Sequence, residues 1–281
     1  MEEMDKIAIL MATYNGEKYI REQLDSLLGQ SYRNFKIYVR DDGSADETVE
    51  IIREYQSRYP DFIVLVTDNT LHRGARDSFM YLLSQVKARY YMFCDQDDVW
   101  LKDKIAVSFA KLRELEGKSP EKPIMVHTDL RVVDEDLKMI YNSLWRWAGF
   151  NVDLNKHFNY TVIGNVFTGC TMIFNRIARD IALPIHPKSS MHDEWIGLLV
   201  AKNGVVDNIK EQTILYRQHG KNVCSIGEKK DFSKQRFSFK SLYQWYYKQK
   251  ELLDFLHYGS VYKAVFFKLL YILKRKYSSN L

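Results

Sequence analysis

An acidic run that directly follows an apolar segment is the strongest chemical signal in this sequence. Asp95, Asp97 and Asp98 come immediately after residues 90–94, YYMFC. Carboxylates crowded at the end of a buried strand are costly unless a cation compensates their charge. Hard divalent ions such as Mn²⁺ or Mg²⁺ prefer oxygen ligands and often bridge protein carboxylates to a diphosphate. The run therefore predicts a metal site, although taken alone it also fits a solvated acidic turn ahead of a helix that begins near Trp100.

Two further polar clusters also follow strand-like segments. Thr13, Tyr14 and Asn15 come after residues 7–12, and the turn of residues 41–44, DDGS, comes after residues 35–40. Asp and Gly are ordinary turn residues and Ser is an ordinary helix cap, so the DDGS turn has a plain structural interpretation. Its functional interpretation is a carboxylate that accepts hydrogen bonds from a base or a ribose.

The segments between these clusters predict how the clusters are positioned. Strands are expected at residues 7–12, 35–40, 63–67 and 90–94, and helices at residues 20–28, 44–59 and 78–86. Ser44 and Glu47 would open the second helix as a capping box. This alternation predicts an α/β fold with a mainly parallel sheet flanked by helices, in which ligands bind beyond the carboxyl ends of the strands. All three clusters lie at such ends, so one pocket can use them together.

The second half of the chain is less regular and ends in a basic, aromatic tail. Strands are expected at residues 124–127 and 168–174, a helix at 195–202, and one or two strands within 207–218. Residues 229–281 contain 12 Lys+Arg and 3 Asp+Glu, a net charge of +9, whereas the whole chain carries +5. The other 228 residues therefore carry −4, which argues against a nucleic-acid-binding protein.

Residues 261–273 predict an amphipathic helix within this tail. At helical spacing one half of the helix is apolar and contains Val261, Tyr262, Val265, Phe266, Leu269, Ile272 and Leu273. Lys263, Lys268, Lys274 and Arg275 fall on the other half. Such a helix is too short and too charged to span a bilayer. It either lies on an anionic membrane surface or packs on the catalytic domain and covers its core.

Composition and cysteine content are typical of a folded globular chain. The 281 residues are 46% hydrophobic and 27% charged, which fits one large domain or one domain with an appendage. Cys94, Cys170 and Cys224 are too few and too scattered for a disulfide framework or a zinc site, so a reducing cytoplasmic compartment is expected. We expect neither a signal peptide nor a transmembrane span.

Taken together and in this order, the motifs resemble a known family. Residues 9–15 (ILMATYN), 26–32 (SLLGQSY) and 41–44 (DDGS) closely resemble the start of family 2 glycosyltransferases with the GT-A fold. Residues 93–100 (FCDQDDVW) resemble the metal-binding D-x-D segment of that family. The form of this segment, together with residues 191–195 (MHDEW) and 216–222 (YRQHGKN), is similar to a bacterial rhamnosyltransferase-like branch. The resemblance covers about residues 6–222.

The resemblance implies a role for each matching position. The implied donor-binding residues are Ala12, Thr13, Tyr14, Asn15, Asp42, Arg76, Asp95 and Gln96. Asp97 and Asp95 would coordinate a Mn²⁺ or Mg²⁺ ion, with His219 as a further contact to the metal or the diphosphate. Asp193 would be the catalytic base.

The implied chemistry is consistent with these residue types. A bound cation would neutralise the diphosphate leaving group of a dTDP- or UDP-sugar. The acceptor hydroxyl must lose a proton as it attacks C1, which requires a carboxylate such as Asp193. A single displacement by this base inverts the anomeric configuration. Asp193 begins an expected helix, whose dipole favours the ionised form, and the plain alternative is that it only caps this helix.

These observations lead to one functional expectation with three competitors. We expect an inverting, metal-dependent glycosyltransferase that transfers a sugar, with rhamnose one candidate, to a glycan or lipid-linked glycan in bacterial cell-surface polysaccharide synthesis. A non-catalytic nucleotide-sugar-binding protein would have no need for Asp193. A nucleotidyltransferase that makes activated sugars usually carries a Gly-rich phosphate loop, which residues 13–17 (TYNGE) do not provide. A membrane-associated interaction protein would explain the tail but not the acidic run.

The expected organisation has two halves and a tail. Residues 1–228 would form the GT-A domain, with a nucleotide-sugar-binding half at 1–130 and an acceptor-binding half with the catalytic base at 131–228. Residues 229–281 would form the helical tail. The expected location is the cytoplasm, with the tail as a peripheral contact to the inner face of the cell membrane. Trp145 and Trp147 fit either a stacking platform for the acceptor or core packing.

Overall fold

A computed structural model describes residues 6–68, 70–220, 222 and 238–278 of the chain, with side chains up to Lys274. The predictions made for Lys221, for Cys224, for the side chain of Arg275 and for residues 229–237 therefore lie outside the described part.

Strands and helices alternate along the first part of the chain, as predicted. The strands are β1 (Ile7–Thr13), β2 (Phe35–Asp41), β3 (Ile63–Leu65), β4 (Tyr90–Cys94), β5 (Val99–Trp100), β6 (Ile124–Val133), β7 (Met139–Tyr141), β8 (Met172–Asn175) and β9 (Val205–Arg217). The helices are α1 (Ile20–Leu28), α2 (Thr48–Arg58), α3 (Gly74–Gln85), α4 (Lys104–Lys118), α5 (Leu144–Ala148), α6 (Phe158–Ile163), α7 (Arg176–Ala182), α8 (His192–Asn203), α9 (Phe239–Lys248), α10 (Lys250–Phe255) and α11 (Val261–Ser278). Two short 3₁₀ turns, η1 (Leu154–Lys156) and η2 (Gly169–Thr171), complete the order.

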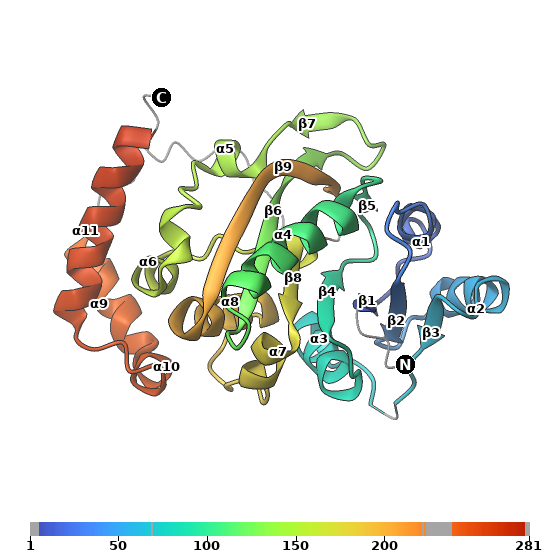
Figure 1. Cartoon of the computed structure of the whole chain (residues 1–281), viewed down its shortest axis with the longest axis horizontal. Coiled ribbons are helices and arrows are strands. Elements are labelled where there is room, and N and C mark those ends of the chain that lie inside the picture. The colour runs from blue at the N-terminus through green and yellow to red at the C-terminus, as the bar shows by residue number, and fades with distance from the viewer. Residues whose placement is uncertain (1–5, 69, 221, 223–237, 279–281) are drawn as a thin grey trace.

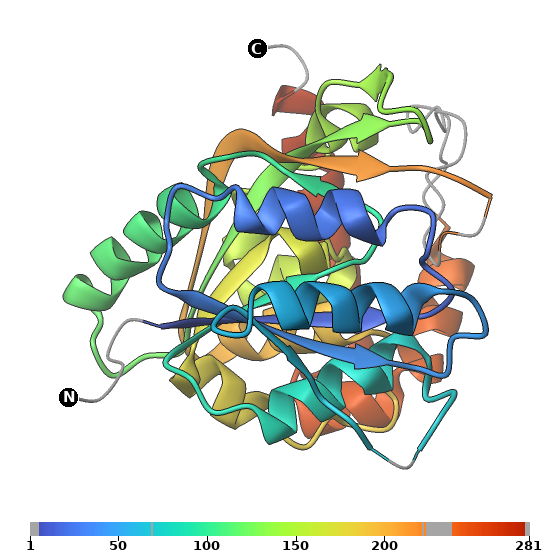
Figure 2. The same ribbon diagram turned by 90° about the vertical axis from the view of Figure 1, so that its right-hand side faces the viewer.

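Within the described residues, nine strands form one sheet in the order β3-β2-β1-β4-β8-β6-β9-β5, with β7 paired to β6. Strands β1 to β4 run parallel to one another, and β8 runs antiparallel to both β4 and β6. Figures 1 and 2 show helices on both faces of this sheet. The predicted α/β fold, with a mostly parallel sheet flanked by helices, is confirmed.

The central strands are buried on both faces, which explains their apolar sequences. In β1, Ile7, Ile9 and Met11 belong to one core cluster with side chains of α1, α2 and α4. Ala8 and Leu10, on the opposite face, belong to a second cluster with side chains of α3 and α8. Successive residues of a strand point to opposite faces, so a strand covered on both sides must be apolar at every position.

The parallel pairing brings the carboxyl ends of β1, β2 and β4 together. Thr13 pairs with Asp41 across β1 and β2, and Met11 pairs with Cys94 across β1 and β4. The loops that follow these three strands therefore leave the sheet at one edge, as the sequence predicts for a nucleotide-binding crevice.

The start of α2 differs from the prediction. Ser44 and Glu47 form no capping box, because the Ser44 hydroxyl donates to Asp41 and the helix begins only at Thr48. Asp46 accepts the backbone N–H of Thr48 at 3.1 Å instead. The Asx-type turn competes for the same backbone groups that a capping box would use.

Other boundaries also move. The helix expected near Trp100 begins at Lys104, because Val99 and Trp100 pair with β9 as the short strand β5. The strand expected from residue 168 begins at Met172, after the η2 turn. Residues 205–217 form one long strand rather than two. The expected division at residue 130 falls inside β6 and stays a prediction.

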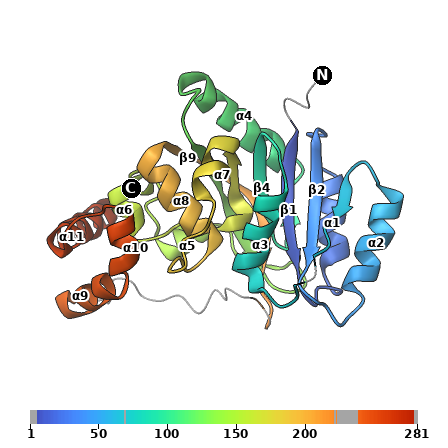
Figure 3. The same ribbon diagram turned by 90° about the horizontal axis from the view of Figure 1, so that it is seen from below.

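The C-terminal helices pack at the opposite end of the molecule from α1 and α2 (Figure 3). Tyr246, Leu256, Tyr258, Ala264 and Tyr271 are buried in the core cluster that contains α3 and α8. The tail thus contributes to the hydrophobic core. None of the described helices is long and apolar enough to cross a membrane.

The last helix leaves several residues of its predicted apolar half exposed. Ala264 and Tyr271 are buried and contact the body of the molecule around α6. The predicted apolar residues Tyr262, Phe266, Leu269 and Leu273 instead face solvent, with exposed fractions of 81, 56, 39 and 55%. The helix therefore has two apolar sides, and packing on the domain uses mainly the side of Ala264 and Tyr271, together with Val261 of the predicted half.

Candidate active site

The acidic loop between β4 and β5 forms the centre of the candidate site. Asp98 is fully buried, and one carboxylate oxygen accepts the backbone N–H of Arg217 at 3.1 Å. The other oxygen has no hydrogen-bond partner among the described residues. Ligand atoms of Asp95, Asp98 and Cys170 lie within 4.8 Å of one another. A buried carboxylate with an unpaired oxygen is costly, which indicates room for a further positive or hydrogen-bonding partner.

Proton binding at this loop is strongly perturbed. Burial, with the neighbouring charges of Asp97 and Asp193, raises the pKa of Asp95 to about 7. Burial also raises the pKa of Asp98 well above its ordinary value, again with the charges of Asp97 and Asp95. Like charges held this close need a cation to stay ionised together. The carboxylates thus fit a hard divalent ion.

Cys170 fits a different role from that of a metal ligand. Its thiol lies within 4.8 Å of carboxylate oxygens of Asp95 and Asp98, and burial raises its own pKa well above the ordinary value. A protonated thiol is a poor ligand for a hard cation but a suitable donor to a carboxylate. The sequence indicated only a core cysteine at this position, and nothing in its apolar surroundings pointed to the acidic loop.

Asp97 and His219, two of the predicted metal ligands, are brought into contact. His219 Nε2 lies 2.8 Å from Asp97 Oδ2, and the His219 ring stacks on Tyr19 with centroids 4.9 Å apart. Asn222 donates to the same carboxylate oxygen at 3.3 Å. The third predicted ligand, Asp95, interacts with Asp97 through charge. Coordination of a metal by these three residues stays a prediction.

Arg217 is a functional position to which the sequence reasoning gave no role. Its buried side chain donates from Nε to the backbone oxygen of Asp97 at 2.8 Å and also forms an ion pair with Glu22. Its guanidinium lies over the Tyr19 ring, 4.5 Å from the centroid. Arg217 thus fixes the acidic loop through its backbone. An arginine at the end of a predicted strand, next to His219 in the YRQHGKN motif, was the available signal.

Gln96 joins the acidic loop to the loop after β1. Its amide accepts the backbone N–H of Tyr14 and donates to the Tyr14 carbonyl, both at 2.9 Å. A Cβ atom on Gly16 would lie only 2.3 Å from Gln96 Oε1, so a larger residue at this position would displace the Gln96 amide from Tyr14. The amide of Gln96 is therefore occupied within the protein, while the Tyr14 side chain remains half exposed beside His72.

Hydrogen bonds also connect the first two predicted clusters. Asp41 accepts the Thr13 hydroxyl at 2.8 Å and the backbone N–H groups of Gly43 and Ser44 at 3.0 and 2.8 Å. Asn15, in a left-handed conformation with φ 48°, donates its N–H to the Ser44 hydroxyl at 2.8 Å. The loops after β1 and β2 thus form one rigid unit. Ala12, half-buried at the end of β1, packs against the core cluster under them.

Asp42 supports the entry to α3. Its carboxylate pairs with Arg40 at 2.7 Å and accepts the N–H groups of Arg73 and Gly74, each at 2.8 Å. Burial opposes ionisation, but these partners hold the pKa of Asp42 below its ordinary value. The Asp42 carboxylate thus has three partners within the protein. Its contact with a base or a ribose stays a prediction.

Asp193 lies in the first turn of α8, where its carboxylate accepts the N–H groups of Glu194 at 2.7 Å and Gly169 at 3.0 Å. Burial raises the pKa of Asp193 to about 6, and these two N–H groups act in the opposite direction. Its charge in turn acts on Asp95, so the predicted base and the acidic loop are neighbours. A carboxylate in this state is ionised near neutral pH and can accept a proton.

Of two other predicted positions, Arg76 lies near this centre and Trp145 lies in the core. Arg76 donates to the carbonyl of Ser189 at 3.0 Å and pairs with Asp77, which places it close to the start of α8. Trp145 is only 7% exposed and packs against His127, so it is a core residue and not a stacking platform.

Comparison with known proteins agrees with this geometry. The family model described as "Glycosyl transferase family 2" matches residues 8–181. A dTDP-rhamnosyl transferase, RfbG of Shigella flexneri, is 42% identical over 98 residues, which is 34% of either protein. An uncharacterized glycosyltransferase of Haemophilus influenzae is 24% identical over 239 residues, 80% of this chain and 69% of that protein. The chain spans only about a third of the length of the first of these relatives.

Solved structures share the fold. TarS of S. aureus in complex with UDP-GlcNAc superposes with a TM-score of 0.60 at 19% identity, covering 89% of this chain and 67% of that one. The mannosyltransferase PcManGT of Pyrobaculum calidifontis, in complex with GDP-Man and Mn²⁺, has a TM-score of 0.59 at 16% identity and covers 77% and 58% of the two chains. The family match over more than half of the residues and the shared architecture lead to one conclusion: this chain is a member of glycosyl transferase family 2 and has the GT-A fold.

Proposed function

We propose that this protein is a metal-dependent, inverting glycosyltransferase that moves one sugar from a nucleotide-diphosphate sugar to an acceptor hydroxyl. The observation that carries the proposal is the neighbourhood of Asp193, a buried carboxylate with a pKa of about 6, and the acidic loop around Asp95. A base and a cation-binding group must stand on either side of the reacting carbon for a single displacement.

The residues divide the work as follows. Asp95 and Asp97 would hold the cation, with His219 beside Asp97, and a bound divalent ion would neutralise the charge of the diphosphate leaving group. Asp193 accepts the proton of the acceptor hydroxyl as its oxygen attacks C1. The N–H groups of Gly169 and Glu194 orient that carboxylate and keep it ionised.

The donor is a nucleotide-diphosphate sugar, and a dTDP-rhamnose donor is the first to test. Support comes from the relative named as a dTDP-rhamnosyl transferase and from neighbours of the same fold in complex with UDP-GlcNAc or GDP-Man. UDP-sugars are the second class to test. A glycan or lipid-linked glycan of a bacterial surface polysaccharide is the acceptor in this proposal.

The C-terminal helices support a peripheral contact with an anionic membrane. Tyr262, Phe266, Leu269 and Leu273 form an exposed apolar stripe on α11. Lys274 follows this stripe; its side chain is exposed, and its ammonium lies 5.5 Å from the centroid of the Tyr160 ring. Aromatic and aliphatic side chains beside lysines are typical of helices that lie at a lipid surface. Such placement would bring the enzyme to an acceptor carried on a lipid.

Replacement of the base tests the proposed function. Asp193→Asn removes the proton acceptor but keeps the shape of the side chain. We expect donor affinity within a few-fold of the wild type and transfer slowed by about 10²–10⁴-fold, the range for loss of a general base. Release of nucleoside diphosphate gives the rate, and NMR of the product should show inversion at C1.

The same assay separates enzyme from sensor. Retention of configuration, or near-normal turnover in Asp193→Asn, would mean that another group performs the step. Donor binding without any acceptor-dependent release of nucleoside diphosphate would identify a non-catalytic nucleotide-sugar-binding protein.

A further inference from the structure

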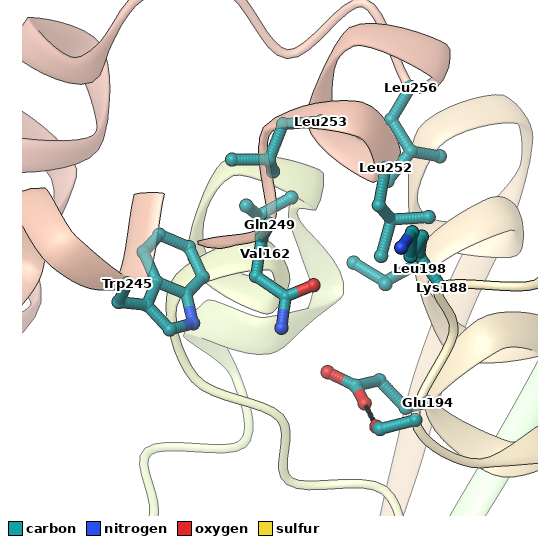
Figure 4. A pocket seen from close by; sticks show the side chains of 10 residues that line it. Val162, Lys188, Glu194, Leu198, Trp245, Gln249, Leu252, Leu253 and Leu256 are labelled. Carbon is teal, nitrogen blue, oxygen red and sulfur yellow. Dashed lines mark hydrogen bonds between the residues drawn. The ribbon is translucent and has the colours of Figure 1, made fainter. Parts of the chain in front are cut away.

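A cavity lies between α8 and the C-terminal helices, immediately beyond the predicted base. A water-sized sphere can occupy about 60 Å³ of it, and the cavity opens to solvent. Its walls come from α6, α8, α9 and α10, and Figure 4 shows the Trp245 indole, the Gln249 amide and the Glu194 carboxylate around one space. Sites that enclose a whole small ligand commonly hold roughly 300–1,000 Å³, so this shallow cavity can take only one face or edge of a ligand, against mostly apolar walls with a few polar groups.

The cavity is connected to the catalytic centre through the start of α8. Glu194 follows Asp193 in the same helical turn, and the Ser190 hydroxyl donates to the Glu194 carboxylate. Arg76 donates to the carbonyl of Ser189, the residue before this segment. A ligand in the cavity would therefore contact Glu194, one residue from the proposed base.

The position of the cavity also separates it from the donor-binding loops. Those loops follow β1, β2 and β4, whereas α6, α9 and α10 lie on the side of α8 that is away from β1 and β2 (Figure 3). The acceptor must approach from the side of Asp193 that the donor does not occupy, because attack and departure take place on opposite faces of C1.

The lining favours an uncharged, hydroxyl-rich ring. The indole of Trp245 and the side chains of Leu198 and Leu252 provide flat apolar surface, on which the C–H face of a pyranose can lie. Glu194 and Gln249 offer hydrogen-bond acceptors and donors at the edge of that surface. The Glu194 carboxylate and the Lys188 ammonium both line the cavity, so the formal charges of its wall balance and do not favour an anion.

We propose that this cavity is a subsite for one sugar residue of the acceptor, which stacks on Trp245 and hydrogen-bonds to Glu194 and Gln249. The inference rests on the proposed glycosyltransferase function and adds that the C-terminal helices form part of the acceptor site. A sugar held here contacts Glu194, so the next residue of the same glycan can extend toward Asp193.

Saturation-transfer NMR on the full-length chain with simple methyl glycosides tests the subsite. The probes are methyl rhamnoside, methyl N-acetylglucosaminide and methyl galactoside, each with and without UDP or dTDP and Mn²⁺. We expect at least one glycoside to bind, and Trp245→Ala to weaken that binding by about tenfold or more, as loss of a central aromatic contact does. Trp245→Phe should retain part of the affinity.

Matched variants and the nucleotide arm keep the outcomes distinct. Tyr243→Ala, on the exposed side of the same helix, is the control and should leave glycoside binding unchanged. Gln249→Ala should weaken glycoside binding. Because this change is smaller, it replaces Trp245→Ala as the test of the subsite if that variant fails to fold. Failure of every glycoside to bind, or unchanged affinity in Trp245→Ala and Gln249→Ala, overturns the subsite. Absence of nucleotide binding to the wild-type protein would instead count against the proposed function.

Discussion

The acidic loop and the C-terminal helices are held in the molecule by different forces. Gln96 and Arg217 tie the loop to β1 and β9 with hydrogen bonds of 2.8–2.9 Å to backbone groups. The last helix attaches mainly by apolar packing of Ala264 and Tyr271, and hydrogen bonds of 2.9 and 3.3 Å run from its Lys263 and Lys268 to the carbonyls of Tyr258 and Ile163. Directional bonds fix positions to within fractions of an ångström, whereas apolar contact mainly fixes burial.

This difference matches what each region has to do. The loop must hold carboxylates in one geometry around a cation and a diphosphate, so it needs partners that define angles as well as distances. The tail must cover a core and, in our proposal, contact an acceptor and a membrane whose positions vary. A change in one region therefore leaves the other region as its control.

Removal of the cation should have the largest effect. We expect EDTA to abolish transfer, and Asp97→Ala to lose metal-dependent donor binding while it remains folded, because the diphosphate charge is then uncompensated. Isothermal titration with donor, with and without Mn²⁺, measures the binding. Full activity in chelator would contradict the proposed metal requirement.

Loosening the loop without touching a proposed ligand should have the next largest effect. Arg217→Met keeps the apolar stem but removes the bonds to Asp97 and Glu22, which should cost about 2–3 kcal/mol of unfolding free energy. Donor affinity should fall as well. Arg53→Met, a surface arginine with a side chain 66% exposed, is the control and should stay within about 0.5 kcal/mol of the wild type. Equal stability of the two variants would show that Arg217 does not hold the loop.

Acidification should move stability and activity in opposite directions. The pKa of Asp95 is raised to about 7 and that of Asp193 to about 6, so the folded metal-free protein binds these protons more tightly than the unfolded chain does. Ionisation of these two carboxylates destabilises the folded state. This loss of stability is complete above their folded pKa values and is relieved as the pH falls through them. We expect the metal-free melting temperature to rise by a few degrees between about pH 8 and pH 6. Saturating Mn²⁺ should remove this rise, while kcat/KM falls below about pH 6 as Asp193 takes up its proton.

The smallest effect on turnover is expected at the exposed stripe of α11. Tyr262→Ser with Phe266→Ser should leave folding and the rate with a soluble acceptor within about twofold, since surface changes away from buried networks have little effect. Co-sedimentation with anionic vesicles at low salt should fall by about threefold or more. Tyr271→Ala is the contrasting variant, because removal of this buried side chain should lower the free energy of unfolding instead. Unaltered vesicle binding in the double variant would remove the support for a membrane contact through this stripe.

Much of the fold and part of the site were predictable from the sequence. The strand and helix order of the first 130 residues was predictable because β1, buried on both faces, leaves a continuous apolar run, and α1 leaves a helical pattern. The gathering of residues 13–15, 41–44 and 95–98 followed from parallel topology. Site chemistry was predictable where residue types were unusual, as for the Asp95–Asp98 run.

The missed features depend on contacts between distant segments. Cys170 lies beside the acidic loop only because η2 and β4 are neighbours in space, and Arg217 reaches Asp97 across 120 residues of chain. The orientation of α11 could not be read from its pattern, because both Tyr262 and Tyr271 belong to apolar sides. Which side is buried depends on the shape of α6 and its surroundings.

The two core clusters have consequences for the order in which the protein is completed during synthesis. In the described residues, the cluster around α1, α2 and α4 draws on nothing after Tyr216, whereas the cluster around α3 and α8 includes Ala264 and Tyr271. Translation delivers the chain from its N-terminus, and segments fold as their partners emerge. One side of the sheet can therefore close while the polypeptide is still being extended. The other side, which includes Leu10 from the first strand, must wait for residues more than 250 positions downstream.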